Sequence, residues 1–192
     1  MKKDSKVHAV QLKAVKLGKD WASGLVPYPT EVVDLIIFHK LHLNRPVSQA
    51  LRSFRRLKDT FVDWNEVRVS TVREIQQELG SNSGSLQLAV FIKDLLEFVH
   101  RERQTVSLEF LVEQNLSEIR RYLKQVKGLD RSTVDLILRI RKEYPVLPLS
   151  SAAEAVVQRL GLLRRVGTRG QKEKVLHELV DPEQALVFHH FL

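Results

Sequence analysis

A short basic turn between two predicted helices is the segment of this 192-residue chain best suited to bind an anion. One amphipathic stretch ends near Leu123, a turn centres on Gly128, and a second amphipathic stretch runs to Leu138. Glycine adopts positive φ at little steric cost, which lets the chain reverse within a few residues. The outgoing helix would begin with orphan N–H groups and the positive end of its dipole, with Asp130 or Ser132 as its predicted cap. A phosphate oxygen suits such a helix start.

The distribution of charge also indicates a polyanionic partner. The formal net charge is +8, and three segments carry the excess: residues 1–20, 120–142 and 159–174 have net charges of +4, +6 and +5, which leaves −7 for the rest. The simplest partner is double-stranded DNA, held through its phosphate backbone. Contacts of this kind read backbone rather than base sequence. The residues predicted to make them are those of the turn and its flanks, namely Lys124, Lys127, Gly128, Leu129, Asp130, Arg131, Ser132 and Thr133.

Several other chemistries are excluded or disfavoured by composition. The chain has no cysteine, so it holds no thiolate zinc site, cysteine nucleophile or iron–sulfur cluster through its own thiols, and we expect no cofactor. His39 and His42 lack a third metal ligand at suitable spacing, as do His189 and His190, so we interpret all four as structural. No apolar window is long enough for a membrane span, and no secretion signal is visible. We therefore expect a monomer of the cytoplasm, associated with the nucleoid if the source is bacterial, without a membrane partner.

Helical periodicity dominates the chain, which predicts an all-α fold. Residues 1–29, rich in lysine and broken by proline, form a predicted arm that would add non-specific affinity for DNA by counterion release. Residues 30–192 form the predicted helical domain, with Thr30 capping its first helix and Ser70 capping a later one. The helices are expected near residues 31–41, 46–58, 71–79, 86–101, 108–112, 116–123, 131–142, 151–160, 170–179 and 182–192.

Two motifs resemble a known family. The segment Val126–Leu138 resembles the helix-hairpin-helix of the endonuclease III-like DNA glycosylases, and Pro148–Leu162 resembles the loop and helix that follow it. The likeness extends upstream through residues 33–57 and 61–79 and downstream to 188–192, so it covers roughly residues 30–192. It implies a two-lobed all-α fold, with the helix-hairpin-helix at about 117–142, the loop and helix at about 144–162, and the hairpin at the mouth of a cleft between the lobes.

The resemblance also implies a chemistry whose residues this chain lacks. Members grip one strand's phosphates, flip a damaged base into the cleft and cleave its glycosidic bond. In bifunctional members a hairpin lysine attacks the sugar C1′ while a loop aspartate supports the developing positive charge. Ser132 occupies the lysine position here and Ser150 the aspartate position. A serine forms no Schiff base and carries no charge, so a loss of thousands-fold in rate is expected.

Further positions depart from the family pattern. Asp130 replaces the second hairpin glycine, and the glutamine that members insert into the duplex falls within residues 40–43, where this chain has Lys-Leu-His-Leu. A substitute acid could be Asp135, for which we prefer a solvated helix face, or Asp130 acting with Lys127. Asp63 is better explained as a helix cap, and Trp64 as packing between the lobes.

Three functional hypotheses follow. The first is a DNA-binding protein of this superfamily, related to base-excision repair, without glycosylase or lyase activity. The second is a divergent monofunctional DNA glycosylase that acts on damaged bases. The third is an interaction protein that uses the fold without nucleic acid.

Overall fold

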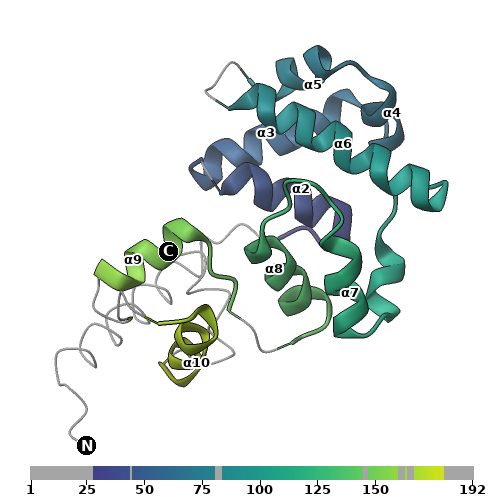
Figure 1. The fold of residues 1–192 in the computed structure, drawn as a ribbon. Helices are drawn as coiled ribbons and strands as arrows, with labels where there is room; N and C mark the ends of the chain where they lie inside the picture. The colour runs from purple at the N-terminus through teal and green to yellow at the C-terminus, as the bar shows by residue number, and fades with distance from the viewer. Residues whose placement is uncertain are drawn as a thin grey trace, which may run out of the picture. The chain divides into compact units, whose positions relative to one another are not determined.

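The computed structural model describes residues 28–43, 45–80, 84–144, 147–159, 163 and 167–179. Every regular element among these residues is a helix, which confirms the predicted all-α class (Figure 1). The described chain divides into two compact units, one formed by Tyr28–Ile137 and the other beginning at Leu138. The arm predicted at residues 1–29 lies almost entirely outside the described residues, and so does the helix predicted at 182–192.

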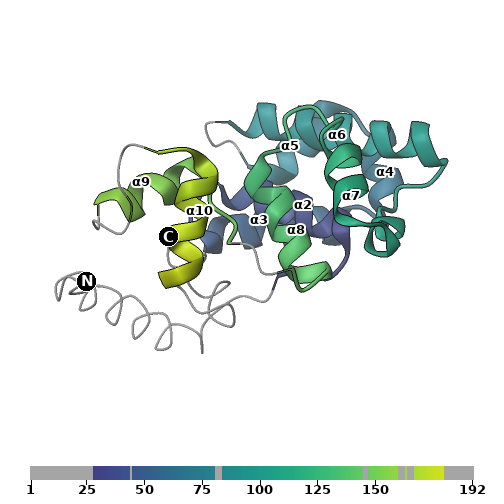
Figure 2. The ribbon, with the colours of Figure 1, turned by 60° about the horizontal axis from the view of Figure 1, so that its bottom comes forward.

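The first unit holds most of the helices. They are α2 (Val32–His42), α3 (Val47–Thr60), α4 (Trp64–Val69), α5 (Val72–Leu79), α6 (Ser85–Arg103), the 3-10 helix η1 (Glu109–Glu113), α7 (Leu116–Leu123) and the start of α8 (Arg131–Arg141). The second unit contains the end of α8, followed by α9 (Ser151–Arg159) and α10 (Arg169–Leu179). Helices α9 and α10 lie near one another in this unit (Figure 2). An ion pair at 2.5 Å between Lys172 of α10 and Glu154 of α9 links them.

Helix α2 is the centre of the first unit's core. It is apolar on nearly every face, a composition typical of a helix surrounded by others, and Leu35, Ile36, Ile37, Phe38 and Leu41 are fully buried. Helix α3 packs on α2 and α5, and α6 packs on α2, α4 and α5. The core therefore fixes the C-terminal turn of α2, which carries His39 and Lys40.

The predicted cap of α2 is wrong. Glu31, rather than Thr30, precedes the helix and makes no side-chain cap. The Val32 N–H instead donates to Glu109 Oε1 at 2.6 Å, a contact across 77 residues of sequence. A local pattern search overlooks such a cap because the acceptor comes from another element.

A second correction concerns the start of α5. The cap is Thr71, not Ser70: Thr71 Oγ1 accepts from the Glu74 N–H at 3.2 Å, and Glu74 Oε2 accepts from the Thr71 N–H at 2.7 Å. This reciprocal arrangement is a capping box, and its hydrogen bonds lower the pKa of the Glu74 carboxyl. Ser70 ends α4 instead, its hydroxyl donating to the Glu66 carbonyl at 2.8 Å.

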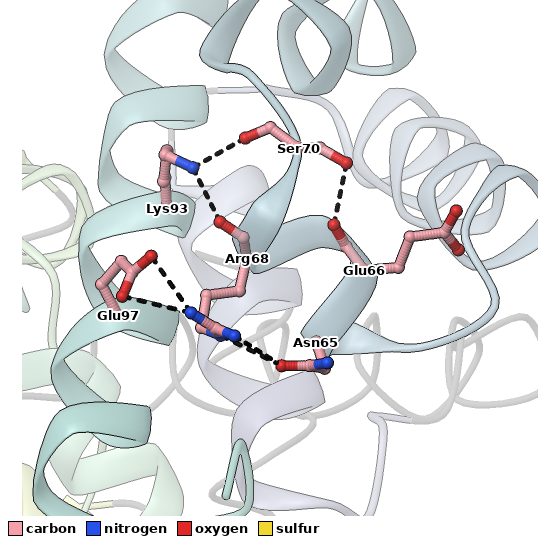
Figure 3. A network of polar contacts seen from close by, with 6 residues as sticks. All are labelled: Asn65, Glu66, Arg68, Ser70, Lys93 and Glu97. Atoms are coloured by element: carbon pink, nitrogen blue, oxygen red, sulfur yellow. Dashed lines mark hydrogen bonds and ion pairs between the residues drawn. The ribbon is translucent and has the colours of Figure 1, made fainter. Parts of the chain in front are cut away.

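The short helix α4, which is absent from the predicted helices, is held to α6 by charged side chains (Figure 3). Asp63 caps its start by accepting from the Glu66 N–H at 2.8 Å, as predicted. Lys93 of α6 donates to the carbonyls of Arg68 and Ser70 at 2.7 Å each, and Arg68 reaches back to Glu97. The last carbonyls of α4 therefore have a cationic partner, which stabilises a helix C-terminus.

We expect Lys93→Met to lower the free energy of unfolding by about 2 kcal/mol, because it removes two hydrogen bonds from a charged donor. The measurement is urea unfolding followed by circular dichroism. Asp94→Asn, at an exposed neighbouring position, is the control and should change stability by less than about 0.5 kcal/mol. Equal stability of the two variants would show that Lys93 does not hold α4 in place.

Candidate nucleic-acid interface

The turn between α7 and α8 has the predicted hairpin geometry. The Leu129 N–H donates to the Val126 carbonyl at 3.2 Å, and Gly128 has φ 78° at the third position of this four-residue turn. Glycine is needed because other residues are strained at positive φ. The Asp130 carbonyl then accepts from the Thr133 N–H at 3.0 Å, which begins α8.

The turn offers both open amides and exposed basic side chains. Among the described residues, the N–H groups of Gly128 and Asp130 have no protein acceptor. The side chains of Lys124, Lys127 and Arg131 are exposed beside them. This combination suits an anion the size of a phosphate group.

Two residues of the predicted contact set face inward. Ser132 is 3% exposed and Thr133 is fully buried. Thr133 Oγ1 is 2.9 Å from His39 Nδ1, a buried contact that joins α8 to α2 across 94 residues. What these two residues can offer to a ligand is therefore their main chain. His39 is a core residue whose ring helps to position the hairpin.

Asp130 precedes α8, but the prediction that its side chain caps this helix is wrong. The Asp130 carboxylate accepts from Lys40 Nζ at 2.5 Å and from no N–H group of the described residues. Lys40 also donates to the Gly128 carbonyl at 2.7 Å, and its Nζ lies 5.0 Å from the centroid of the Phe91 ring. Lys40 falls in the segment that aligns with the family's inserted glutamine, but here it is bound to the hairpin.

The expectation for Asp135 is also wrong. Its side chain is 1% exposed rather than solvated, and its carboxylate lies 3.7 Å from the Arg131 guanidinium. Asp135 lines a pocket of about 500 Å³ together with basic and aliphatic side chains of α7, the turn and α8. The other lining residues are Arg120, Leu123, Lys124, Leu129, Arg131 and Val134. A helical wheel could not show this burial, because the tertiary contacts that bury a side chain are not part of the local pattern.

Ser150, in the second unit, has a structural role. Its Oγ accepts from the Ala153 N–H at 3.1 Å, and its carbonyl accepts from the Glu154 N–H at 2.8 Å. Ser150 is therefore the N-cap of α9, a position for which serine and aspartate are both strongly preferred. Replacement of an aspartate by serine at this position keeps the helix start but removes the charge.

We expect Ser150→Ala to destabilise the chain by about 1 kcal/mol, the usual cost of losing an N-cap, and Ser150→Asp to keep wild-type stability. Chemical denaturation of the three proteins measures this. A larger loss for the aspartate variant than for the alanine variant would mean that the cap is not the role of this side chain.

Trp64 has a structural role, and His189 and His190 lie outside the described residues. Trp64 is buried against Phe54, donates from Nε1 to Asp34 and lies beneath Lys58, all within residues 28–137, so the expected packing between lobes is wrong. No group of three or more potential metal ligands occurs among the residues that the structure describes. Over the same residues, no helix combines the length and the apolar character needed to cross a bilayer.

Comparison with known proteins gives two curated relatives of interest, although no family model matches the chain. A candidate DNA glycosylase of Arabidopsis thaliana is 24% identical over 152 residues, which is 79% of this chain and 52% of that protein. Protein ROS1A of Oryza sativa subsp. japonica is 25% identical over 100 residues, or 52% of this chain and 5% of that protein. The chain thus spans about half the length of the first relative and a small part of the second.

Solved structures share the fold. An endonuclease III trapped as a covalent intermediate with DNA superposes with a TM-score of 0.71 at 18% identity, covering 100% of this chain and 84% of that one. The 3-methyladenine DNA glycosylase MagIII of H. pylori, bound to 1,N6-ethenoadenine, gives a TM-score of 0.66 at 15% identity, covering 93% and 94%. The chain is therefore similar in sequence to a candidate DNA glycosylase and shares the fold of endonuclease III and MagIII.

Proposed function

We propose that this protein binds double-stranded DNA as a monomer through the phosphate backbone and carries out neither glycosylase nor lyase chemistry. The observation that carries the proposal is the 126–133 turn, where the open N–H groups of Gly128 and Asp130 lie beside exposed lysines. Two of the solved structures with this fold are complexes of endonuclease III with DNA, which supports a nucleic-acid ligand for the same fold here.

The proposed loss of chemistry rests on two hydroxyls. Ser132 is almost fully buried and offers no amine, and Ser150 accepts from the Ala153 N–H as a helix cap. Neither side chain can be a Schiff-base nucleophile or a carboxylate that stabilises a cationic sugar. The DNA would be held without reaction at these two positions.

A second candidate function has one specific observation in its favour. The buried Asp135 carboxylate lines the pocket beside the hairpin, so a monofunctional glycosylase with a relocated acid is the alternative. A buried carboxylate near a pocket is a common feature of catalytic sites. The alternative requires base release from a damaged duplex, and it requires that Asp135→Asn abolishes that release.

The test measures binding and chemistry on the same protein. Fluorescence anisotropy with a labelled 20-mer duplex at several salt concentrations should show one protein per site and a steep loss of affinity with salt. A panel of duplexes with damaged bases and abasic sites should show neither base release nor strand cleavage above the rate without protein. If the anisotropy of the labelled duplex does not change at low salt, the result would favour the hypothesis of an interaction protein that does not bind nucleic acid.

A further inference from the structure

Lys40 makes two hydrogen bonds to the hairpin, although it is 88 residues from Gly128 in sequence, and one contact with a ring of α6. Its Nζ donates to the Gly128 carbonyl at 2.7 Å and to Asp130 Oδ2 at 2.5 Å. It also lies over the Phe91 ring, at 5.0 Å from the centroid. Only 19% of its side chain is exposed, so this lysine is committed to the protein rather than to solvent.

Asp130 is poorly suited to an anion-binding turn on its own. A carboxylate at the residue before α8 is well placed to accept from the first N–H groups of that helix, because aspartate is among the strongest N-cap residues. It would then accept from the Ser132 or Thr133 N–H at the start of that helix, and its charge would repel a phosphate held at the neighbouring open amides. In the structure the carboxylate instead accepts from Lys40, and the Asp130 and Gly128 N–H groups stay open among the described residues.

From these contacts we infer that Lys40 is a positioning residue for phosphate binding: it holds the Asp130 carboxylate away from the start of α8 and neutralises it. Its second bond, to the Gly128 carbonyl, fixes the turn in which the open amides lie. This inference rests on the proposed function, because it describes how the same turn is kept ready for a phosphate. Lys40 itself makes no contact with DNA in this arrangement.

The closing experiment is a double-mutant cycle on duplex affinity, measured by fluorescence anisotropy. The salt concentration runs from about 0.05 to about 0.2 M, a range of roughly fourfold from which the slope of log affinity against log salt is obtained. Lys40→Met should weaken binding about tenfold, because one uncompensated negative charge then lies beside the phosphate. Asp130→Ala should bind at least as tightly as the wild type. The double variant Lys40→Met/Asp130→Ala should return to within about threefold of the wild type, because its net charge is restored and the competing carboxylate is gone.

A matched control separates this role from a general loss of charge. Lys58 also pairs with an aspartate, Asp34 at 3.3 Å, and lies 5.1 Å from the centroid of the Trp64 ring, but it is on α3. Lys58→Met therefore removes the same charge and similar contacts, and it should change affinity by less than about threefold because exposed charges are screened beyond a Debye length. Thermal melts of all variants confirm that the measured proteins are folded.

The outcomes are distinguishable. Equal weakening in Lys40→Met and the double variant, with the salt slope lower by about one in both, would mean that Lys40 contacts a phosphate directly and would overturn the inference. Wild-type affinity in Lys40→Met would also overturn it while leaving the proposed function intact. Weakening of more than tenfold in Asp130→Ala, which keeps Lys40, would show that the carboxylate itself is required. No binding by the wild type would instead reject the proposed function.

Discussion

Reversal of charge at Lys124 and Lys127 together is expected to weaken duplex binding about a hundredfold at 0.1 M salt. Each phosphate contact contributes a slope of about −0.9 to the dependence of log affinity on log salt, which corresponds to roughly eightfold in affinity at 0.1 M. Both lysines are exposed beside the open amides of the turn. Glutamate at these positions removes two contacts and adds repulsion. The measurement is anisotropy over a salt series, and the slope should become shallower by about two.

The control for this variant changes the net charge by the same amount elsewhere. Arg52→Glu/Arg55→Glu alters two exposed positions of α3 that lie outside the hairpin. At 0.1 M salt the Debye length is about 10 Å, so we expect a loss of less than about fivefold. If the two double variants lose affinity equally, binding follows total charge and the hairpin is not the interface.

The second large effect concerns chemistry at the two serine positions. Ser132→Lys/Ser150→Asp is expected to form a borohydride-trapped adduct with a duplex that contains an abasic site, at least about a thousandfold faster than the wild type. The lysine returns the amine that the superfamily resemblance places in the hairpin, and the aspartate returns the charge. The positive end of the α8 dipole also favours the unprotonated, nucleophilic amine. Ser150→Asp keeps the cap of α9, so the second unit should tolerate it.

A control variant with a side chain of similar size distinguishes the effect of the amine from the effect of a larger side chain at position 132. Ser132 is almost fully buried, so a long side chain there must find room whatever its chemistry. Ser132→Met/Ser150→Asp imposes a similar steric load without an amine and should give no adduct. An adduct with this control or with the wild type would show that another residue is the nucleophile, and the proposed loss of chemistry would be wrong. No adduct from the lysine variant, despite wild-type affinity, would mean that more than two side chains separate this chain from a lyase.

Local sequence signals predicted the helices well where apolar side chains recur with the period of an α-helix. The limits of α7 are those predicted, and those of α8, α9 and α10 differ by one residue. The apolar run at 32–41 indicated a buried central helix, and Asp63 indicated a helix start, both of which the structure confirms. Gly128 predicted the turn because only glycine adopts its φ without strain.

Three of the errors share one cause, which is the influence of groups that lie outside the local sequence pattern. Glu109 caps α2 in place of Thr30, and Lys40 removes Asp130 from the cap of α8. Asp135 is buried although it lies in a basic stretch, because its neighbours in the fold cover it. The helix α4 is absent from the predicted helices for a different reason, since six residues are too few to show a periodic pattern.

The sequence by itself determined the helical class, the glycine turn with its basic flank and the serines at the two positions that the family resemblance singles out, because each depends on residue type and short-range spacing. The tertiary structure alone decided which groups around that turn are available to a ligand. It placed Lys40 against Gly128 and Asp130, and His39 against Thr133, across 88 to 94 residues. Such pairings arise from the packing of α2 beside the hairpin. No periodicity within a single helix encodes them, because the free energy that selects them comes from the whole core.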